Sequence, residues 1–273
     1  MSKVSAIQLN SGPNVKVNLY DVKTFIEQIA DLGSKMVVLP ENFALMPEND
    51  ADYIKHAEDL GDGQIQNYLS DLASSYKIWI VGGTIPIKSK DKDRVMASTI
   101  TYNEKGEQVS LYNKIHLFDV ELDNGERHSE SAHYEAGQEA VIADLSFGKL
   151  GMTVCYDVRF PALFRSLAMH GADFISVPAA FTKMTGEAHW HVLLRARAIE
   201  TGCFIFAPAQ SGTHENGRKT YGHSIIVSPW GRVLADAGLE TQIIYADIDT
   251  DQVQMARRQI PALEHGRHFE PPV

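Results

Sequence analysis

The sequence predicts an α/β fold in which mixed β-sheets carry flanking helices, folded as a single domain over residues 1–273. Short apolar runs rich in β-branched residues alternate with segments of helical period, a pattern typical of a sheet covered by helices. Two strand-like stretches between residues 94 and 114 are divided by a turn at 103–106, which predicts a β-hairpin and therefore a mixed sheet. No internal repeat, low-complexity tract or linker rich in proline, glycine or serine is present, so one domain is favoured over two.

The first half of the chain begins with an expected strand at Val4–Leu9. Apolar residues then recur at spacings of three and four from Val15 to Ile29, which predicts a helix that ends near Gly33. The same alternation predicts a buried strand at 36–39, a helix at 65–76, and a strand at 78–81.

The second half is expected to begin with a long polar loop over residues 119–139, and loops of this length inside a domain are often functional. Downstream, we expect strands at 150–155, 174–177, 203–207, 224–227 and 243–248, with helices at 161–170, 189–200 and 251–259.

The composition argues against several classes of protein. Hydrophobic residues make up 44% of the chain and charged residues 22%, which excludes an intrinsically disordered protein. The formal net charge of -10 argues against nucleic acid as a partner, because phosphate backbones are bound by basic surfaces. Two cysteines are too few for a disulfide-stapled scaffold, and no apolar run suits a signal peptide or a membrane span. We therefore expect a cytoplasmic protein with no membrane partner.

Cys155 is the first candidate catalytic residue. It ends an apolar strand, and Pro161 follows where the first turn of a helix accepts proline, so the thiol is expected at a strand-to-helix turn. Backbone N–H groups at such a turn favour a thiolate and can hold an oxyanion. A buried structural cysteine fits the same position. Cys203, in contrast, begins an apolar run and is expected in the core.

A cysteine nucleophile needs a base, and the sequence offers two kinds. Four histidines are plausible: His116, His189, His191 and His223. None stands at a spacing typical of cysteine proteases. Glu41 and Lys114 each directly follow a predicted strand, where open α/β sheets place their sites, although solvated strand-end residues would look the same. No HExxH or paired CxxC motif is present, so no metal site is predicted.

Three ordered motifs together resemble the nitrilase superfamily of carbon-nitrogen hydrolases, whose members use a Glu-Lys-Cys constellation. The motifs are VLPEN at 38–42, YNKIHLFD at 112–119 and CYDVRFP at 155–161. The likeness continues through residues 185–190, 194–200, 221–224 and 229–231, and so covers essentially the whole chain. The glutamate that usually follows the proline of the third motif is Ala162 here, a departure outside the catalytic trio.

The resemblance implies an α-β-β-α sandwich, with four layers on assembly, and a homodimer or larger homo-oligomer. We expect the C-terminal segment, from about residue 249 to 273, to lie in an oligomer contact.

The resemblance also implies roles for site residues. Glu41 would be the general base, Cys155 the nucleophile, and Lys114 with the backbone N–H of Tyr156 the donors to the oxyanion. Glu130 best matches the second glutamate of the family, with Glu135 as the alternative. No cofactor is implied, because this amide hydrolysis uses only side chains, backbone and water.

Within the superfamily, the chain looks most similar to the branch that contains deaminated glutathione amidase and omega-amidase, which act on a carboxamide of a small acidic molecule. The candidate substrate contacts are Arg159, Trp190, Arg195, Arg197 and Tyr221. The arginines could instead form structural ion pairs, and the aromatic residues could belong to the core. A catalytically silent binding protein, or an enzyme that passes the acyl group to an amine, would fit the same fold.

Overall fold

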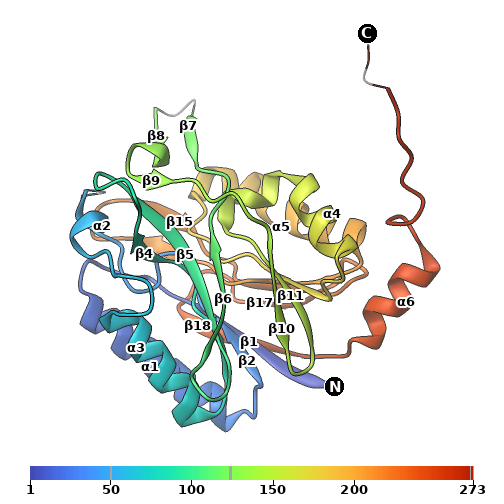
Figure 1. Cartoon of the computed structure of the whole chain (residues 1–273), viewed down its shortest axis with the longest axis horizontal. Coiled ribbons are helices and arrows are strands. Elements are labelled where there is room, and N and C mark those ends of the chain that lie inside the picture. The colour runs from blue at the N-terminus through green and yellow to red at the C-terminus, as the bar shows by residue number, and fades with distance from the viewer. Residues whose placement is uncertain (50, 123–124, 271, 273) are drawn as a thin grey trace.

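The computed structural model describes residues 1–49, 51–122, 125–270 and 272. Two large β-sheets pack face to face, and helices cover the outer face of each, so one chain forms all four layers of an α-β-β-α sandwich (Figure 1). This arrangement confirms the predicted α/β fold with mixed sheets and flanking helices.

The first sheet has eight strands in the order β18-β1-β2-β3-β5-β4, with β6 and β9 also paired to β5. Its strands are β1 (Ser2–Gln8), β2 (Met36–Val38), β3 (Trp79–Val81), β4 (Ile85–Lys88), β5 (Val95–Tyr102), β6 (Gln108–Asn113), β9 (Tyr134–Glu135) and β18 (Gln242–Ile248). Strands β1, β2 and β3 are parallel, whereas β5 and β6 form the predicted antiparallel hairpin.

The second sheet has six strands in the order β10-β11-β12-β13-β16-β17. They are β10 (Val141–Leu145), β11 (Gly148–Met152), β12 (Phe174–Ser176), β13 (Phe204–Ala207), β16 (Ile225–Val227) and β17 (Val233–Asp236). Two small sheets are added by β7 (Asp119–Glu121) with β8 (Arg127–Ser129), and by β14 (Ser211–Thr213) with β15 (Lys219–Tyr221).

Alternating side chains explain why the central strands are apolar along their whole length. In β1, Val4 and Ala6 face the second sheet, while Ile7 packs under the helices on the outer face. In β2, Met36 and Val38 face the second sheet in the same way. A strand buried on both faces has no polar side to reveal its period, so it reads as a short apolar run.

The helices lie on the outer faces, as their apolar stripes predict. The first sheet is covered by α1 (Val15–Asp31), which begins after the capping side chain of Asn14, and by α3 (Gln64–Tyr76). The second sheet is covered by α4 (Pro161–Met169) and α5 (Lys183–Thr201). Short elements complete the chain: α2 (Asp52–Lys55), the 3-10 helices η1 (Glu130–Ala132) and η2 (Cys155–Arg159), and α6 (Asp251–Gln259).

Some boundaries differ from the sequence prediction. Helix α5 begins at Lys183, ahead of the expected start at His189. Gly186 lies inside this helix and packs against Tyr221, where a Cβ would lie 2.3 Å from the tyrosine side chain. Residues 119–139 are not one loop but contain β7, β8, η1 and β9. The strand expected at 150–155 ends at Met152, before the cysteine.

The C-terminal chain after α6 runs away from the two sheets (Figure 1). Helix α6 itself is held to the sandwich by Arg257, which donates to the backbone oxygens of Ala172 and Thr201 at 2.7 and 3.1 Å. The expected oligomer contact of this segment stays a prediction. Across the described ranges, no helix combines the length and the apolarity that a membrane crossing requires.

Candidate active site

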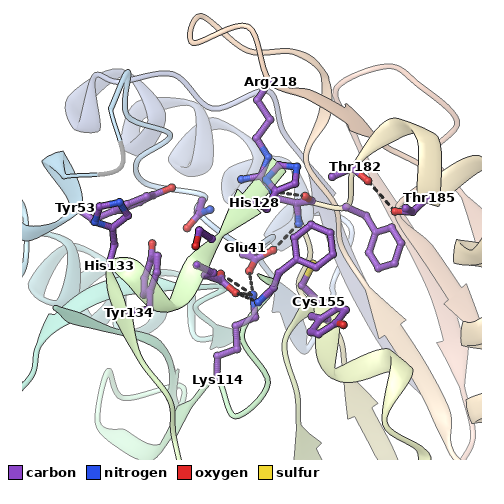
Figure 2. A pocket seen from close by; sticks show the side chains of 17 residues that line it. Glu41, Tyr53, Lys114, His128, His133, Tyr134, Cys155, Thr182, Thr185 and Arg218 are labelled. Carbon is purple, nitrogen blue, oxygen red and sulfur yellow. Dashed lines mark hydrogen bonds and ion pairs between the residues drawn. The ribbon is translucent and has the colours of Figure 1, made fainter. Parts of the chain in front are cut away.

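A pocket with about 630 Å³ of empty space opens where strands of both sheets end (Figure 2). From the first sheet, Glu41 follows β2 and Lys114 follows β6. From the second sheet, Cys155 follows β11 and Ala180 follows β12, while Glu130 comes from η1. The structure thus brings four sequence-predicted side chains to one pocket, from segments far apart in the chain.

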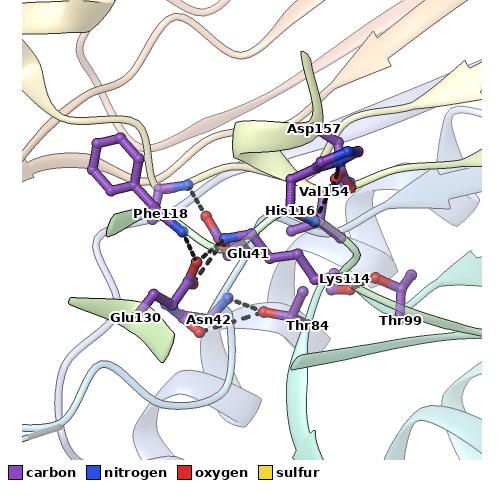
Figure 3. Close-up of polar contacts among 12 residues, drawn as sticks. Glu41, Asn42, Thr84, Thr99, Lys114, His116, Phe118, Glu130, Val154 and Asp157 are labelled. Carbon is purple, nitrogen blue, oxygen red and sulfur yellow. Dashed lines mark hydrogen bonds and ion pairs between the residues drawn. The ribbon is translucent and has the colours of Figure 1, made fainter. Parts of the chain in front are cut away.

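Lys114 is the central charge of this pocket and is only 2% exposed. Its Nζ lies 2.9 Å from Glu41 Oε1 and 2.8 Å from each carboxylate oxygen of Glu130 (Figure 3). Burial alone would lower the pKa of Lys114, but the carboxylates of Glu130 and Glu41 raise it well above its ordinary value. Lys114 is therefore a buried ammonium held between two carboxylates and not a solvated strand end.

Glu41 is fixed by donors on both sides. Lys114 binds Oε1, and the backbone N–H of Ala180 donates to Oε2 at 2.7 Å. Burial would raise the pKa of Glu41, but the charge and hydrogen bond of Lys114, with the nearby charge of Arg218, hold that pKa below its ordinary value. The carboxylate is therefore ionised and can accept a proton.

Cys155 begins η2 with a backbone φ of 46°, in the left-handed region that side chains other than glycine seldom adopt. Its N–H donates to the carbonyl of Pro178 at 2.8 Å, which helps to hold this conformation. Burial and the adjacent Glu41 carboxylate raise the pKa of the thiol well above its ordinary value, against the opposing charge of Lys114. The resting thiol is protonated, so a nucleophilic role requires a base, and Glu41 lies beside it.

Asp157, two residues after the cysteine, joins the turns that carry Cys155 and Lys114 (Figure 3). Its buried carboxylate accepts hydrogen bonds from the hydroxyl of Tyr112 at 2.7 Å and from the backbone N–H of Val154 at 2.8 Å. The other oxygen lies 3.1 Å from the backbone N of His116 and 2.6 Å from its Nδ1. One carboxylate therefore ties the segment after β6 to the segment after β11.

Two glycines allow backbone segments to approach each other at the site. A Cβ on Gly83, whose φ is 51°, would lie 2.0 Å from the carbonyl oxygen of Pro40, the residue before Glu41. A Cβ on Gly137 would lie 2.1 Å from the carbonyl oxygen of Asn113, and the Gly137 N–H donates to Lys114 O at 2.8 Å. These positions need glycine because the space for a side chain is taken by backbone.

Glu130, and not Glu135, is the glutamate that contacts Lys114. The backbone N–H of Phe118 donates to Glu130 at 2.6 Å, which aims the carboxylate at the ammonium. Glu135 lies in β9, paired with Met96 of β5, and is not among the described residues that line the pocket.

The residues expected to contact substrate lie outside the described lining of this pocket. Arg159 comes nearest, because its guanidinium lies over Tyr156 and Phe181, two residues that do line it, at 5.8 and 5.2 Å from the ring centres. Arg195 instead donates to the carbonyl of Gly231 at 2.9 Å.

The remaining expected contacts have structural partners. Arg197 is buried and donates to Val158 O at 2.8 Å, in addition to its ion pair with Glu200. Trp190 is fully buried and donates from Nε1 to a backbone carbonyl, and Tyr221 stacks on His223. Helical and strand periodicity indicates burial of these side chains but not the cavity that each one faces.

Arg218, which the sequence reasoning missed, supplies the guanidinium of the pocket (Figure 2). It stands in the turn between β14 and β15 and donates at 2.7 Å to the carbonyl oxygen of Ala180, the residue whose N–H holds Glu41. Its Nε is buried without a hydrogen-bond partner among the described residues. The only local sign in the sequence is the preceding turn at Asn216-Gly217, which says nothing about a site.

The second cysteine is separate from the pocket. Cys203 is fully buried, and its Sγ lies 3.2 Å from Ala172 O and 3.1 Å from the guanidinium of Arg257. Burial raises the pKa of this thiol although Arg257 opposes the shift. Cys203 is thus a core residue, as expected, with a cation at its side that the sequence did not indicate.

An α-β-β-α sandwich that gathers a buried cysteine, an ionised glutamate and a buried lysine in one pocket defines a hydrolase of the cysteine-dependent class. A family model described as carbon-nitrogen hydrolase matches residues 3–258 of this chain. The chain belongs to the carbon-nitrogen hydrolase family and is an enzyme that acts on carbon-nitrogen bonds other than peptide bonds.

Relatives and solved structures agree with this assignment. The chain is similar to the deaminated glutathione amidase of Yersinia enterocolitica, with 42% identity over 97% of this chain and 93% of the relative. It is 35% identical to omega-amidase NIT3 of Saccharomyces cerevisiae, over 97% of this chain and 93% of that protein. The crystal structure of the C. elegans NitFhit protein superposes with a TM-score of 0.91 at 35% identity and covers 97% of this chain. This chain spans 65% of that worm protein.

Proposed function

We propose that this chain is a thiol amidase that hydrolyses an amide of a small acidic molecule to a carboxylate and the freed amine or ammonia, with deaminated glutathione as its substrate. The observation that carries the proposal is the buried Lys114 ammonium, held 2.9 Å from Glu41 and 2.8 Å from Glu130 in the pocket of Cys155. The similarity to curated deaminated glutathione amidases supports the choice of substrate.

In the first half-reaction, Glu41 takes the proton of the Cys155 thiol while sulfur forms a bond to the amide carbon. The carbonyl oxygen becomes an oxyanion, which Lys114 and the backbone N–H of Tyr156 stabilise. Glu41 then gives its proton to the amide nitrogen, the carbon-nitrogen bond breaks, and the amine leaves, which is cysteinylglycine from deaminated glutathione and ammonia from a primary carboxamide. The product is a thioester on Cys155.

In the second half-reaction, Glu41 accepts a proton from water as the water oxygen attacks the thioester carbon. The carbon-sulfur bond breaks, the carboxylic acid is released, and the cysteine sulfur regains a proton. Glu130 keeps Lys114 charged and in place through both steps, since it contacts the ammonium with both oxygens. We assign Glu130 a positioning role.

Arg218 is the group that we propose for binding the substrate carboxylate. The charges of Glu41, Glu130, Lys114 and Arg218 sum to zero, so the pocket does not repel an anion although the whole chain carries a net charge of -10. Arg218 lines the pocket, and guanidinium groups bind carboxylates with paired hydrogen bonds.

Hydrolysis of three amides and one nitrile tests the proposal, with the freed amine of cysteinylglycine measured for deaminated glutathione and ammonia for the other three compounds. The panel contains deaminated glutathione, 2-oxoglutaramate, 2-oxosuccinamate and a simple nitrile, each with wild type and Cys155→Ala. We expect the highest kcat/KM with deaminated glutathione, an acyl adduct on Cys155 by intact mass, and neither turnover nor adduct in Cys155→Ala. Turnover by Cys155→Ala would refute the mechanism.

Omega-amidase activity is the second candidate, supported by the similarity to omega-amidase NIT3. A higher kcat/KM with 2-oxoglutaramate than with deaminated glutathione would favour it. Product formed only after an amine is added would indicate acyl transfer, and the absence of both hydrolysis and adduct would indicate a binding protein.

We further propose that the chain acts as one domain in a homo-oligomer within a reducing compartment such as the cytoplasm, where the thiol of Cys155 stays unoxidised. Light scattering coupled to size-exclusion chromatography measures the oligomeric state. A monomer at the concentrations used for the activity assay would contradict this part of the proposal.

A further inference from the structure

A cluster of two histidines and an aspartate lies outside the pocket and has no part in the mechanism above. His191 comes from α5, His223 from the chain between β15 and β16, and Asp236 from the end of β17. One ligand atom from each residue lies within 4.8 Å of the other two. In the part of the chain that the structure describes, no other group of three such side chains meets this condition.

Both imidazole rings direct a nitrogen at the same carboxylate. His191 Nε2 lies 2.8 Å from Asp236 Oδ2, and His223 Nδ1 lies 2.9 Å from Oδ1. Ligands bound at about 2.0–2.2 Å to one tetrahedral zinc ion are roughly 3.3–3.5 Å apart, so small rotations of these side chains would admit an ion. We propose that His191, His223 and Asp236 bind a divalent transition-metal ion of the zinc class.

The chemistry of the donors favours this class of ion. Two imidazole nitrogens and one carboxylate oxygen are ligands typical of zinc, whereas calcium and magnesium take oxygen ligands. Each histidine can stay neutral when it binds, because its proton can reside on the other ring nitrogen.

The ligands are also held in place by their surroundings. The N–H of His223 donates to Gly238 O at 2.7 Å, and Trp190 Nε1 donates to His223 O at 2.8 Å. The N–H of Gly238 donates to Asp236 Oδ1 at 2.8 Å, which orients the carboxylate. Such outer contacts orient metal ligands in known sites.

The site is accessible and has room for a further ligand. The side chains of His191, His223 and Asp236 are 32, 24 and 29% exposed, so an ion can enter from solvent. Three protein ligands leave the fourth tetrahedral position for water. The ion would link α5 to the edge strand β17, away from the catalytic pocket.

Calorimetric titration of the tag-free full chain with ZnCl2 tests the proposal. The titration is run on the wild type and on Cys155→Ala, so that the catalytic thiol cannot supply the binding. We expect one equivalent of zinc in both proteins and affinity at least about tenfold weaker in His191→Gln, His223→Asn and Asp236→Asn, as loss of a ligand or its support typically gives. Asparagine is chosen at residue 223 because it tolerates the φ of 53° there.

The exposed His170, whose Nδ1 contacts Ser166 O at 2.8 Å, supplies the matched control His170→Gln, which should bind zinc as the wild type does. Circular dichroism shows that each variant is folded, and a zinc-dependent rise in Tm, present in the wild type and absent in the three variants, is the second readout. The proposal is overturned by the absence of saturable one-to-one binding, by equal binding in all variants, or by binding that disappears with the Cys155 thiol alone.

Discussion

The Lys114→Met variant tests the charge arrangement of the pocket most directly, because it removes the ammonium and keeps a side chain of similar length. The proposed oxyanion loses one donor, and such a loss typically lowers kcat about 100 to 1,000-fold. The buried carboxylate of Glu41 and the partly buried carboxylate of Glu130 also lose their cation, and breaking a buried ion pair costs about 3–5 kcal/mol of unfolding free energy. Each carboxylate keeps a backbone donor, from Ala180 and Phe118, so we expect the lower end, about 3 kcal/mol.

The same variant should change two pH dependences. In the wild type, the folded-state pKa of Glu41 is below its unfolded value, so its contribution to stability is present above the unfolded pKa and is lost as pH falls through the folded one. Without Lys114, burial raises the folded pKa of Glu41 above the unfolded value, the folded state binds the extra proton, and stability falls as pH rises. The loss of stability should therefore be larger at pH 8 than at pH 5, and the acidic limb of kcat/KM should move to higher pH.

Release of cysteinylglycine from deaminated glutathione between pH 5 and pH 9 measures the activity, and urea unfolding at pH 5 and pH 8 measures the stability. Lys149→Met is the matched control, because Lys149 is an exposed lysine 3.8 Å from an exposed aspartate, and its loss should change stability by about 0.5 kcal/mol or less. If Lys114→Met kept kcat/KM within about threefold of the wild type, or if its pH profile did not move, the assignment of Lys114 and Glu41 would be refuted.

Three further substitutions test the support of the site. In Asp157→Asn an NH2 group replaces one carboxylate oxygen, although the partners of this carboxylate are hydrogen-bond donors, so at least one donor is left unpaired. We expect the free energy of unfolding in urea to fall by about 1–3 kcal/mol, and kcat to change by a larger factor than KM. Gly137→Ala forces a Cβ toward Asn113 O and should displace the neighbouring Lys114, and unchanged kcat with unchanged Tm would contradict the close approach. Asp236 has its pKa lowered to about 2, so its contribution to stability is lost as pH falls from about 4 to 2; Asp236→Asn should flatten Tm against pH in that window, and an unaltered Tm profile would argue against the hydrogen bonds assigned to this carboxylate.

Much of the fold could be predicted because its central elements carry one strong pattern each. Strands buried on both faces, such as Met36–Val38, read as apolar runs, and α1 shows a stripe at helical spacing. The edge strands β4, β10 and β17 were not predicted, because β10 and β17 bury few of their residues, while three of the four residues of β4 are buried without a clear alternation. Pro86 weakens the pattern of β4 further, although an edge strand can accept it.

The same limit applies to the site. Glu41, Lys114 and Cys155 could be named because each directly follows or ends a recognisable strand within a motif of the family. Arg218 could not, because it reaches the pocket from a turn whose position depends on the packing of two small strands. Trp190 and Tyr221 were expected at the substrate, whereas Trp190 packs against Phe181 and Tyr221 stacks on the partly exposed His223. A linear pattern indicates that a side chain is buried, and only the packing of the layers decides which cavity it reaches.

The pocket takes Glu41 and Lys114 from one sheet and Cys155 from the other, with the Tyr112–Asp157 hydrogen bond spanning the same boundary. Catalysis therefore depends on the alignment of the two sheets. A shift of one sheet along the other would separate the thiol from the base without breaking the pairing of strands within either sheet. Mild denaturant should then abolish turnover before the circular dichroism signal of the β-sheets changes. The rate of turnover would therefore report small displacements of one sheet along the other, which circular dichroism of the backbone does not detect.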